Sequence, residues 1–155
     1  MPRITGLVPL ASDAPHLKRT LKSLKLCDEI IVVDGCDPDQ DKKTRLFGVV
    51  VKKAIPGVTL GAYIVDSRND WILVLRPNEE LDERLVESLK AWKSGDHEES
   101  GFAFEISEKT GDDGWCKHLA EMRLVNRRKI NWVDELPPNN TMAPKLPGDI
   151  LRYPE

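Results

Sequence analysis

Four consecutive β-forming residues place the strongest limit on how this chain can fold. Residues 30–33 read Ile-Ile-Val-Val, and Asp34 and Gly35 follow directly. Because successive side chains of a strand point to opposite faces, a strand that is apolar at every position must be buried on both faces. Such strands belong to parallel sheets that are covered on both sides. The segment therefore predicts an α/β fold in which Asp34 lies at one edge of the sheet.

The first half of the chain alternates between strand patterns and helix patterns. Apolar runs predict strands, and they span residues 4–10, 30–33, 49–51 and 71–75. Apolar residues at helical spacing, together with capping and turn residues, predict helices at residues 13–25, 38–47 and 60–65. Strands that alternate with helices form parallel sheets with right-handed crossovers. We therefore expect a mostly parallel central sheet over residues 4–75.

The pattern changes after residue 75. Residues 82–94 predict a helix, with Asp82 in its first turn and Lys93 in its last. Residues 102–106 alternate like a half-buried strand. Residues 122–125 and 130–133 then predict a hairpin that is joined through residues 126–129, which are most simply read as a solvated tip.

Prolines are concentrated at the C-terminal end of the chain. The last 19 residues hold five of the eleven prolines, which favours an extended segment that wraps the surface. A length of 155 residues fits a single domain. We therefore expect one domain at residues 1–136, with residues 137–155 packed on it as an extended segment.

The composition excludes several classes of protein. The net charge is −3, whereas a general nucleic-acid binder would show a broad basic excess. Cys27, Cys36 and Cys116 are widely spaced and predict neither a zinc site nor a disulfide framework. We see no signal peptide and no apolar run near the roughly 20 residues of a membrane span. We therefore expect a cytoplasmic protein without a nucleic-acid partner or an integral membrane segment; peripheral contact with the inner membrane face remains an alternative.

Polar residues follow two of the predicted strands, where open α/β sheets bind their ligands. Asp34 and Gly35 end one strand, and residues 76–79 (Arg-Pro-Asn-Glu) end another. A carboxylate at Asp34 can accept hydrogen bonds from a base N–H or a ribose hydroxyl, and the neighbouring glycine lets the backbone approach a ligand. Aspartate also caps turns and helices, so capping is the alternative interpretation.

Four segments resemble one enzyme family in the same order along nearly the whole chain. Residues 4–10 read Ile-Thr-Gly-Leu-Val-Pro-Leu, and residues 27–35 read Cys-Asp-Glu-Ile-Ile-Val-Val-Asp-Gly. The third segment is residues 69–75 followed by residues 79–81, and the fourth is residues 122–136. Together they resemble the family 2 glycosyltransferases of the GT-A fold, and are most similar to small bacterial members that build lipopolysaccharide cores and other surface glycans. The resemblance implies a three-layer α/β sandwich that handles a nucleotide-diphosphate sugar.

The resemblance also implies where the donor binds. Asp34, next to Gly35, stands where the family holds the uracil or ribose, which makes a UDP-sugar the expected donor. Pro9 and the following residues up to Asp13 would form the first loop over the nucleotide. The usual Asn-Glu of that loop is replaced here by Ser12-Asp13. The acceptor implied by the resemblance is a glycan or glycolipid.

The sequence departs from the family at the end of the fourth strand. The family has an Asp-x-Asp that binds Mg²⁺ or Mn²⁺, whereas this chain has Arg76-Pro77-Asn78. Divalent cations need oxygen ligands, which an arginine does not offer, so a metal cofactor is disfavoured and only Asn78 and Glu79 remain as donors. In one interpretation Arg76 pairs directly with the diphosphate. In the other the site has decayed, and Arg76 forms a salt bridge with Glu79 or Glu80.

The resemblance places the candidate catalytic base near residue 135. Glu135 stands where the family has the Glu of a His-Glu element, and Asp134 replaces the histidine; either would take the proton of the acceptor hydroxyl. Asp112 and Asp113 are weaker candidates, read more simply as turn residues. Arg152 is either a phosphate contact or a surface residue. Two hypotheses follow: an inverting sugar transferase, or a catalytically silent relative that acts as a binding or scaffolding module.

Overall fold

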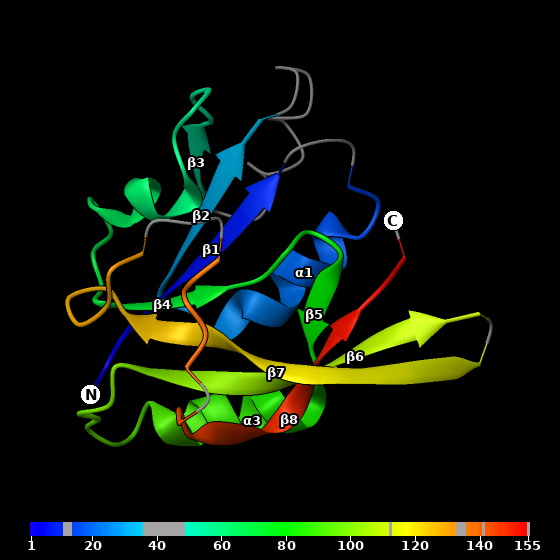
Figure 1. Cartoon of the computed structure of the whole chain (residues 1–155). Coiled ribbons are helices and arrows are strands. Elements are labelled where there is room, and N and C mark those ends of the chain that lie inside the picture. Colours follow the sequence, from blue (N-terminus) through cyan, green and yellow to red (C-terminus); the bar gives the residue numbers. More distant parts are fainter. Residues whose placement is uncertain (11–13, 36–48, 112, 133–135, 141, 155) are drawn as a thin grey trace.

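The computed structural model describes residues 1–10, 14–35, 49–111, 113–132, 136–140 and 142–154. Within these residues the strands form one eight-stranded sheet in the order β3-β2-β1-β4-β7-β6-β8-β5 (Figure 1). The strands are β1 (Ile4–Leu10), β2 (Glu29–Asp34), β3 (Val50–Lys53), β4 (Trp71–Val74), β5 (Glu79–Leu81), β6 (Gly101–Thr110), β7 (Gly114–Asn126) and β8 (Lys145–Arg152). The helices are α1 (Leu17–Ser23), α3 (Glu83–Trp92) and the short 3₁₀ helices η1 (Leu24–Leu26) and η3 (Leu60–Ile64).

The first four strands confirm the predicted parallel sheet. β1 pairs in parallel with both β2 and β4, and β2 pairs in parallel with β3. Val32 packs in the core on one face of the sheet, whereas Ile31 and Val33 pack in the core on the other. Burial on both faces was the basis for predicting an α/β fold. The helix predicted at residues 38–47 lies outside the described residues.

The sheet separates two hydrophobic cores, which gives the molecule three layers. On one face α1 and α3 contribute Leu21, Leu85 and Leu89 to a core. On the other face η3 packs with Ile130 and Trp132. Four of the seven neighbouring strand pairs in the described sheet are parallel, since β6 and β8 are also parallel. The predicted mixed α/β architecture is therefore confirmed.

The hairpin predicted at residues 122–133 is wrong. β7 instead pairs antiparallel with β6 through the turn at Gly111, whose φ is +62°. At residues 124–125 both edges of β7 are occupied, by β6 on one side and β4 on the other, so no edge remains there for residues 130–132. Ile130 and Trp132 are apolar because they cover the face of the sheet beside η3.

Residues 145–152 of the C-terminal segment form β8, which lies inside the sheet. β8 runs between β6, to which it is parallel, and β5, to which it is antiparallel (Figure 1). Tyr153 follows β8. Its ring stacks on the ring of His16, just before α1, with 5.3 Å between the ring centres. Residues near the two ends of the chain therefore meet beside α1, and the expectation of a segment wrapped over the surface is wrong for β8.

Candidate functional site

The carboxyl ends of β1, β2 and β3 meet at one edge of the sheet. Leu10 is paired with Asp34, and Asp34 with Lys53, while the Gly35 amide donates to the Leu10 carbonyl at 2.6 Å. β4 ends beside β1, because the Leu75 amide donates to the Leu7 carbonyl at 3.1 Å. The two predicted polar clusters, at residues 34–35 and 76–79, therefore lie at the ends of two parallel strands, β2 and β4, that flank β1 at the same edge.

Asp34 is completely buried at the end of β2. Its carbonyl accepts a hydrogen bond from the Ala54 amide at 2.8 Å, which extends the pairing of β2 and β3 past the last residue of β3. Gly35 next to it is exposed, so the backbone at this point is accessible to a ligand. The capping alternative concerns the turn after Gly35, which lies outside the described residues.

Glu79 is buried and is held by two arginines from other strands. Arg123 on β7 forms a bidentate ion pair with it, Nη1 to Oε1 at 2.7 Å and Nη2 to Oε2 at 3.0 Å, and both side chains are fully buried. Arg152 on β8 donates from Nε to Oε2 at 3.0 Å. Both arginines also contact Glu121, at 3.5 Å and 3.3 Å. Two cations and two anions therefore form a neutral, mostly buried network.

The network keeps Glu79 ionised. Burial by itself would raise the pKa of Glu79, but the charge of Arg123, its hydrogen bonds and the Arg76 amide outweigh burial and lower the pKa. Burial likewise acts to lower the pKa of Arg123, and the Glu79 carboxylate raises it overall. Both groups are therefore charged, and neither oxygen of Glu79 remains available to a ligand.

Acid is expected to destabilise the fold through Glu79. Because its folded pKa lies below the ordinary value of 4.5, the carboxylate contributes stability above that value and loses it as pH falls through the folded pKa. We expect the free energy of unfolding, measured by urea titration, to decline below about pH 4.5. Burial acts to raise the pKa of Asp28, but the hydrogen bonds from Lys93 and the Ile4 amide, together with the charges of Lys93 and Arg3, lower it overall. Asp28→Asn is therefore the control and should still show the decline. Stability that stays constant down to about pH 3 would contradict this prediction.

The residues at the end of β4 do not fit a divalent metal ion. The Glu79 oxygens are bound by arginines, and Asn78 alone offers one amide oxygen, whereas Mg²⁺ takes about six oxygen ligands. No group of three His, Cys, Asp or Glu residues in the described part of the chain could hold a metal ion. Glu79, one of the two oxygen donors that the sequence leaves at this position, therefore has no oxygen available for a metal ion.

Arg76 does not form the predicted salt bridge. Its side chain is exposed, and no ion pair involves it within the residues that the structure describes. Glu79 instead accepts a hydrogen bond from the backbone amide of Arg76 at 2.8 Å. The other predicted partner, Glu80, accepts from the Tyr153 hydroxyl at 2.5 Å. The guanidinium of Arg76 is thus available to a ligand.

Asn78 contacts the C-terminal segment. Its side-chain amide donates to the Tyr153 carbonyl at 2.8 Å, and its own carbonyl accepts from the Tyr153 amide at 2.8 Å. The guanidinium of Arg19 lies over the Tyr153 ring, 4.1 Å from its centre. The side-chain amide nitrogen of Asn78 is thus engaged in anchoring Tyr153.

Of the remaining predicted site residues, some lie within the described part of the chain and others lie outside it. Asp13, Asp112, Asp134 and Glu135 lie outside the described residues, so that the candidate base is not placed. Pro9 is the next-to-last residue of β1, and Asp113 is exposed in the turn between β6 and β7. Arg152 is ion-paired with Glu79 and Glu121, which overturns its interpretation as a surface residue.

Sequence reasoning missed Arg123. Residues 122–125 read Met-Arg-Leu-Val, and this arginine is the one charged residue of that run. Met122, Leu124 and Val125 are all buried, as Arg123 is. A lone arginine within an apolar strand is a usable signal, because a buried charge requires an ionic partner.

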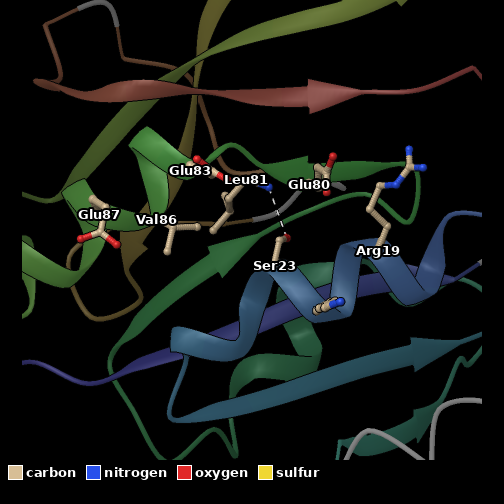
Figure 2. Close-up of a pocket in the computed structure, with 8 residues that line it drawn as sticks. Arg19, Ser23, Glu80, Leu81, Glu83, Val86 and Glu87 are labelled. Carbon is tan, nitrogen blue, oxygen red and sulfur yellow. Dashed lines mark hydrogen bonds between the residues drawn. The ribbon is translucent and has the colours of Figure 1, made fainter.

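A separate hollow of about 380 Å³ lies between α1 and the β5–α3 segment (Figure 2). Basic residues of α1, Arg19 and Lys22, line one wall, and Glu80, Glu83 and Glu87 line the other. The Ser23 hydroxyl accepts from the Leu81 amide at 3.2 Å across its floor. The glutamates make this hollow unfavourable for a diphosphate, so we place the candidate site at the strand ends instead.

No described helix combines the length and the apolar character that crossing a membrane requires. No protein-family model and no curated protein matches the chain.

Several solved structures share the fold. A structure of S. aureus TarS aligns with 72% of this chain and 38% of its own, with a TM-score of 0.55 and 16% identity. The structure of TarS in complex with UDP aligns over the same shares of both chains, with a TM-score of 0.55 and 17% identity. A 4-diphosphocytidyl-2C-methyl-D-erythritol synthase aligns with 82% of this chain and 76% of its own, with a TM-score of 0.52 and 16% identity. Glucosyl-3-phosphoglycerate synthase from Mycobacterium tuberculosis covers 71% of this chain and 45% of its own, with a TM-score of 0.50 and 15% identity.

These likenesses define the fold class. The chain has the mixed α/β, GT-A-like fold of the nucleotide-diphospho-sugar transferases, as the sequence predicted. The chain spans well under half the length of the TarS structure that it matches. At this level of identity the likeness shows the fold alone, and function must be argued from the site.

Proposed function

We propose that this domain binds a nucleotide-diphosphate sugar, with UDP as the nucleotide, at the edge formed by the ends of β1, β2 and β4. The observation that carries the proposal is the exposed Arg76 guanidinium, which has no ion pair among the described residues and follows a strand beside β1. Asp34 ends the strand on the other side of β1. A guanidinium binds phosphate oxygens in a fork, and a carboxylate accepts from a base or ribose.

Arg76 takes the role that a metal ion has in related transferases. A diphosphate needs compensating positive charge, and the residues around Asn78 and Glu79 do not fit a divalent cation. The likeness to TarS, whose structure has been solved with UDP, supports the choice of nucleotide. In an active enzyme Asp134 or Glu135 would be the base of an inverting transfer to a glycan or glycolipid.

A second candidate function is a binding module without catalysis. The observation that favours it is the absence of fitting metal ligands at the end of β4, together with the engagement of both Glu79 oxygens. Such a module would bind the same nucleotide sugar at Asp34 and Arg76. The two candidates differ only in whether UDP is released over time when an acceptor is present.

Thermal unfolding with added nucleotides tests the proposal. Because a ligand of the folded state stabilises it, UDP and a UDP-sugar at about 100 times Kd should add about 2.7 kcal/mol of stability. We expect this stabilisation without Mn²⁺, and stronger for UDP-sugars than for GDP-sugars. In Asp34→Asn it should fall to less than half, because the carboxylate acceptor is lost.

Asp66→Asn is the matched control for this experiment. Asp66 is an exposed aspartate that follows η3, and its replacement should leave the nucleotide effect unchanged. The proposal fails when no nucleotide at saturating concentration stabilises the wild-type protein. A strict requirement for Mn²⁺ would instead refute the replacement of the metal by Arg76. Release of UDP from a UDP-sugar in the presence of acceptors distinguishes the enzyme from the binding module.

A further inference from the structure

The turn formed by residues 76–79 is fixed at each of its residues. Within it the Arg76 amide donates to Oε1 of Glu79 at 2.8 Å, and the Glu79 amide donates to the Arg76 carbonyl at 3.0 Å. The Thr20 hydroxyl of α1 lies 3.0 Å from the Pro77 carbonyl and 2.5 Å from the Glu79 carbonyl. Asn78 exchanges two hydrogen bonds with Tyr153. The backbone of this turn is therefore held from α1 and from the C-terminal segment.

The carboxylate at the centre of the turn is itself held from two further strands. Arg123 of β7 binds both oxygens of Glu79, and Arg152 of β8 binds Oε2. Oε1 therefore accepts two hydrogen bonds, one from the Arg123 guanidinium and one from the backbone amide of Arg76. A charged acceptor forms a stronger hydrogen bond to an amide than a neutral one does. The position of the Arg76 backbone thus depends on the ionised Glu79.

The side chain of Arg76 contrasts with this rigid backbone. It is exposed and forms no ion pair with any described residue, and Glu79 uses its oxygens on other groups. An arginine loses rotamer freedom when it binds a ligand, but a backbone that is already ordered adds no further ordering cost. A fixed turn that presents an unpaired guanidinium is what recognition of a phosphate requires.

We propose that Glu79 is a positioning residue: held by Arg123 and Arg152, it fixes the Arg76 backbone so that the Arg76 guanidinium meets the diphosphate of the nucleotide sugar. This inference rests on the proposed function, because it assigns the diphosphate to Arg76. Glu79 itself touches no ligand. Its contribution to binding therefore passes entirely through Arg76.

A double-mutant cycle on UDP affinity tests this inference, since residues that act through one another have non-additive effects. By isothermal titration calorimetry, Arg76→Ala should weaken UDP binding about 10- to 100-fold. Glu79→Gln should weaken it about tenfold, because the carboxylate that holds the turn is lost. In the Arg76→Ala background, Glu79→Gln should cause no further loss. Glu87→Gln is the matched control and should bind UDP as the wild type does, since Glu87 is exposed on α3 and pairs with Lys90 rather than with the turn.

A second readout needs no ligand. Hydrogen exchange of the Arg76 amide should be at least about tenfold faster in Glu79→Gln than in Glu87→Gln. If Glu79→Gln does not fold, Glu79→Gln/Arg152→Gln removes one charge of each sign and leaves Arg123 paired with Glu121. The double variant then takes the place of Glu79→Gln in the measurements of UDP affinity and of hydrogen exchange.

The outcomes separate this inference from the proposed function. Unchanged UDP affinity in Glu79→Gln, or an equal loss in both backgrounds, overturns the positioning role and leaves UDP binding intact. Unchanged exchange of the Arg76 amide overturns it as well. Failure of the wild type to bind UDP, or unchanged affinity in Arg76→Ala, overturns the assignment of the diphosphate to Arg76 and this inference with it.

Discussion

Replacing Glu79 by leucine is expected to lower the free energy of unfolding by about 3–5 kcal/mol. The substitution leaves Arg123 fully buried, with a 3.5 Å contact to Glu121 and a hydrogen bond from Nη1 to the neutral Val74 carbonyl at 3.2 Å. Removing one partner of a buried ion pair leaves an uncompensated charge whose desolvation is no longer offset. The Arg76 amide also loses its acceptor. Urea unfolding at neutral pH, followed by tryptophan fluorescence, measures the loss.

Two controls define the cause of this loss. In Glu79→Leu/Arg123→Met both members of the buried pair are replaced by apolar groups, which is often neutral or stabilising, so most of the stability should return. Glu87→Leu removes an exposed glutamate of α3 and should change stability by no more than about 0.5 kcal/mol. A loss in Glu79→Leu no larger than that of Glu87→Leu would contradict the importance of the network.

Replacing Gly148 by alanine is expected to cost about 3 kcal/mol of stability. Gly148 lies in β8 with a φ of +116°, which L-residues rarely adopt. A Cβ there would lie 2.3 Å from the amide nitrogen of Leu85 and 2.5 Å from its Cα, at the start of α3. Because these atoms belong to the backbone, α3 would have to move away from β8. Urea unfolding of the variant measures the cost.

Gly57→Ala separates backbone strain from close packing. Gly57 also has a positive φ, +83°, but a Cβ there would meet no atom within 4 Å. Its replacement should therefore cost only about 1 kcal/mol, the strain of the left-handed conformation. Equal losses in Gly57→Ala and Gly148→Ala would show that the close approach of β8 to α3 contributes nothing.

Local patterns were sufficient for the first strands and for α3. The apolar run at residues 30–33 predicts β2, and alternate residues of it indeed pack in the two cores. Asp82 was expected in the first turn of a helix, and its side chain accepts from the Leu85 amide at 2.8 Å as the N-cap. These features depend on residues that are close in sequence, so that periodicity and capping preferences specify them.

Strand pairing after residue 100 could not be predicted from local sequence patterns. Residues 130–132 have the composition of a strand, but β6 and β4 already occupy both edges of β7 at residues 124–125. β8, from the proline-rich segment, lies between β6 and β5 because their edges were free to pair with it. Which edges are free is a property of the assembled sheet, and a single segment does not contain that information.

For the candidate site, too, some features follow from local sequence and others depend on the tertiary structure. The sequence by itself determined that Asp34 ends a doubly buried strand and that Arg76 directly follows another buried strand. Only the tertiary structure decided that Glu79 pairs with Arg123 and Arg152, which are 44 and 73 residues away in the chain. An ion pair forms between the groups that folding buries together, because a buried charge must find its partner in space rather than in sequence. That pairing leaves Arg76, rather than Glu79, available at the edge of the sheet.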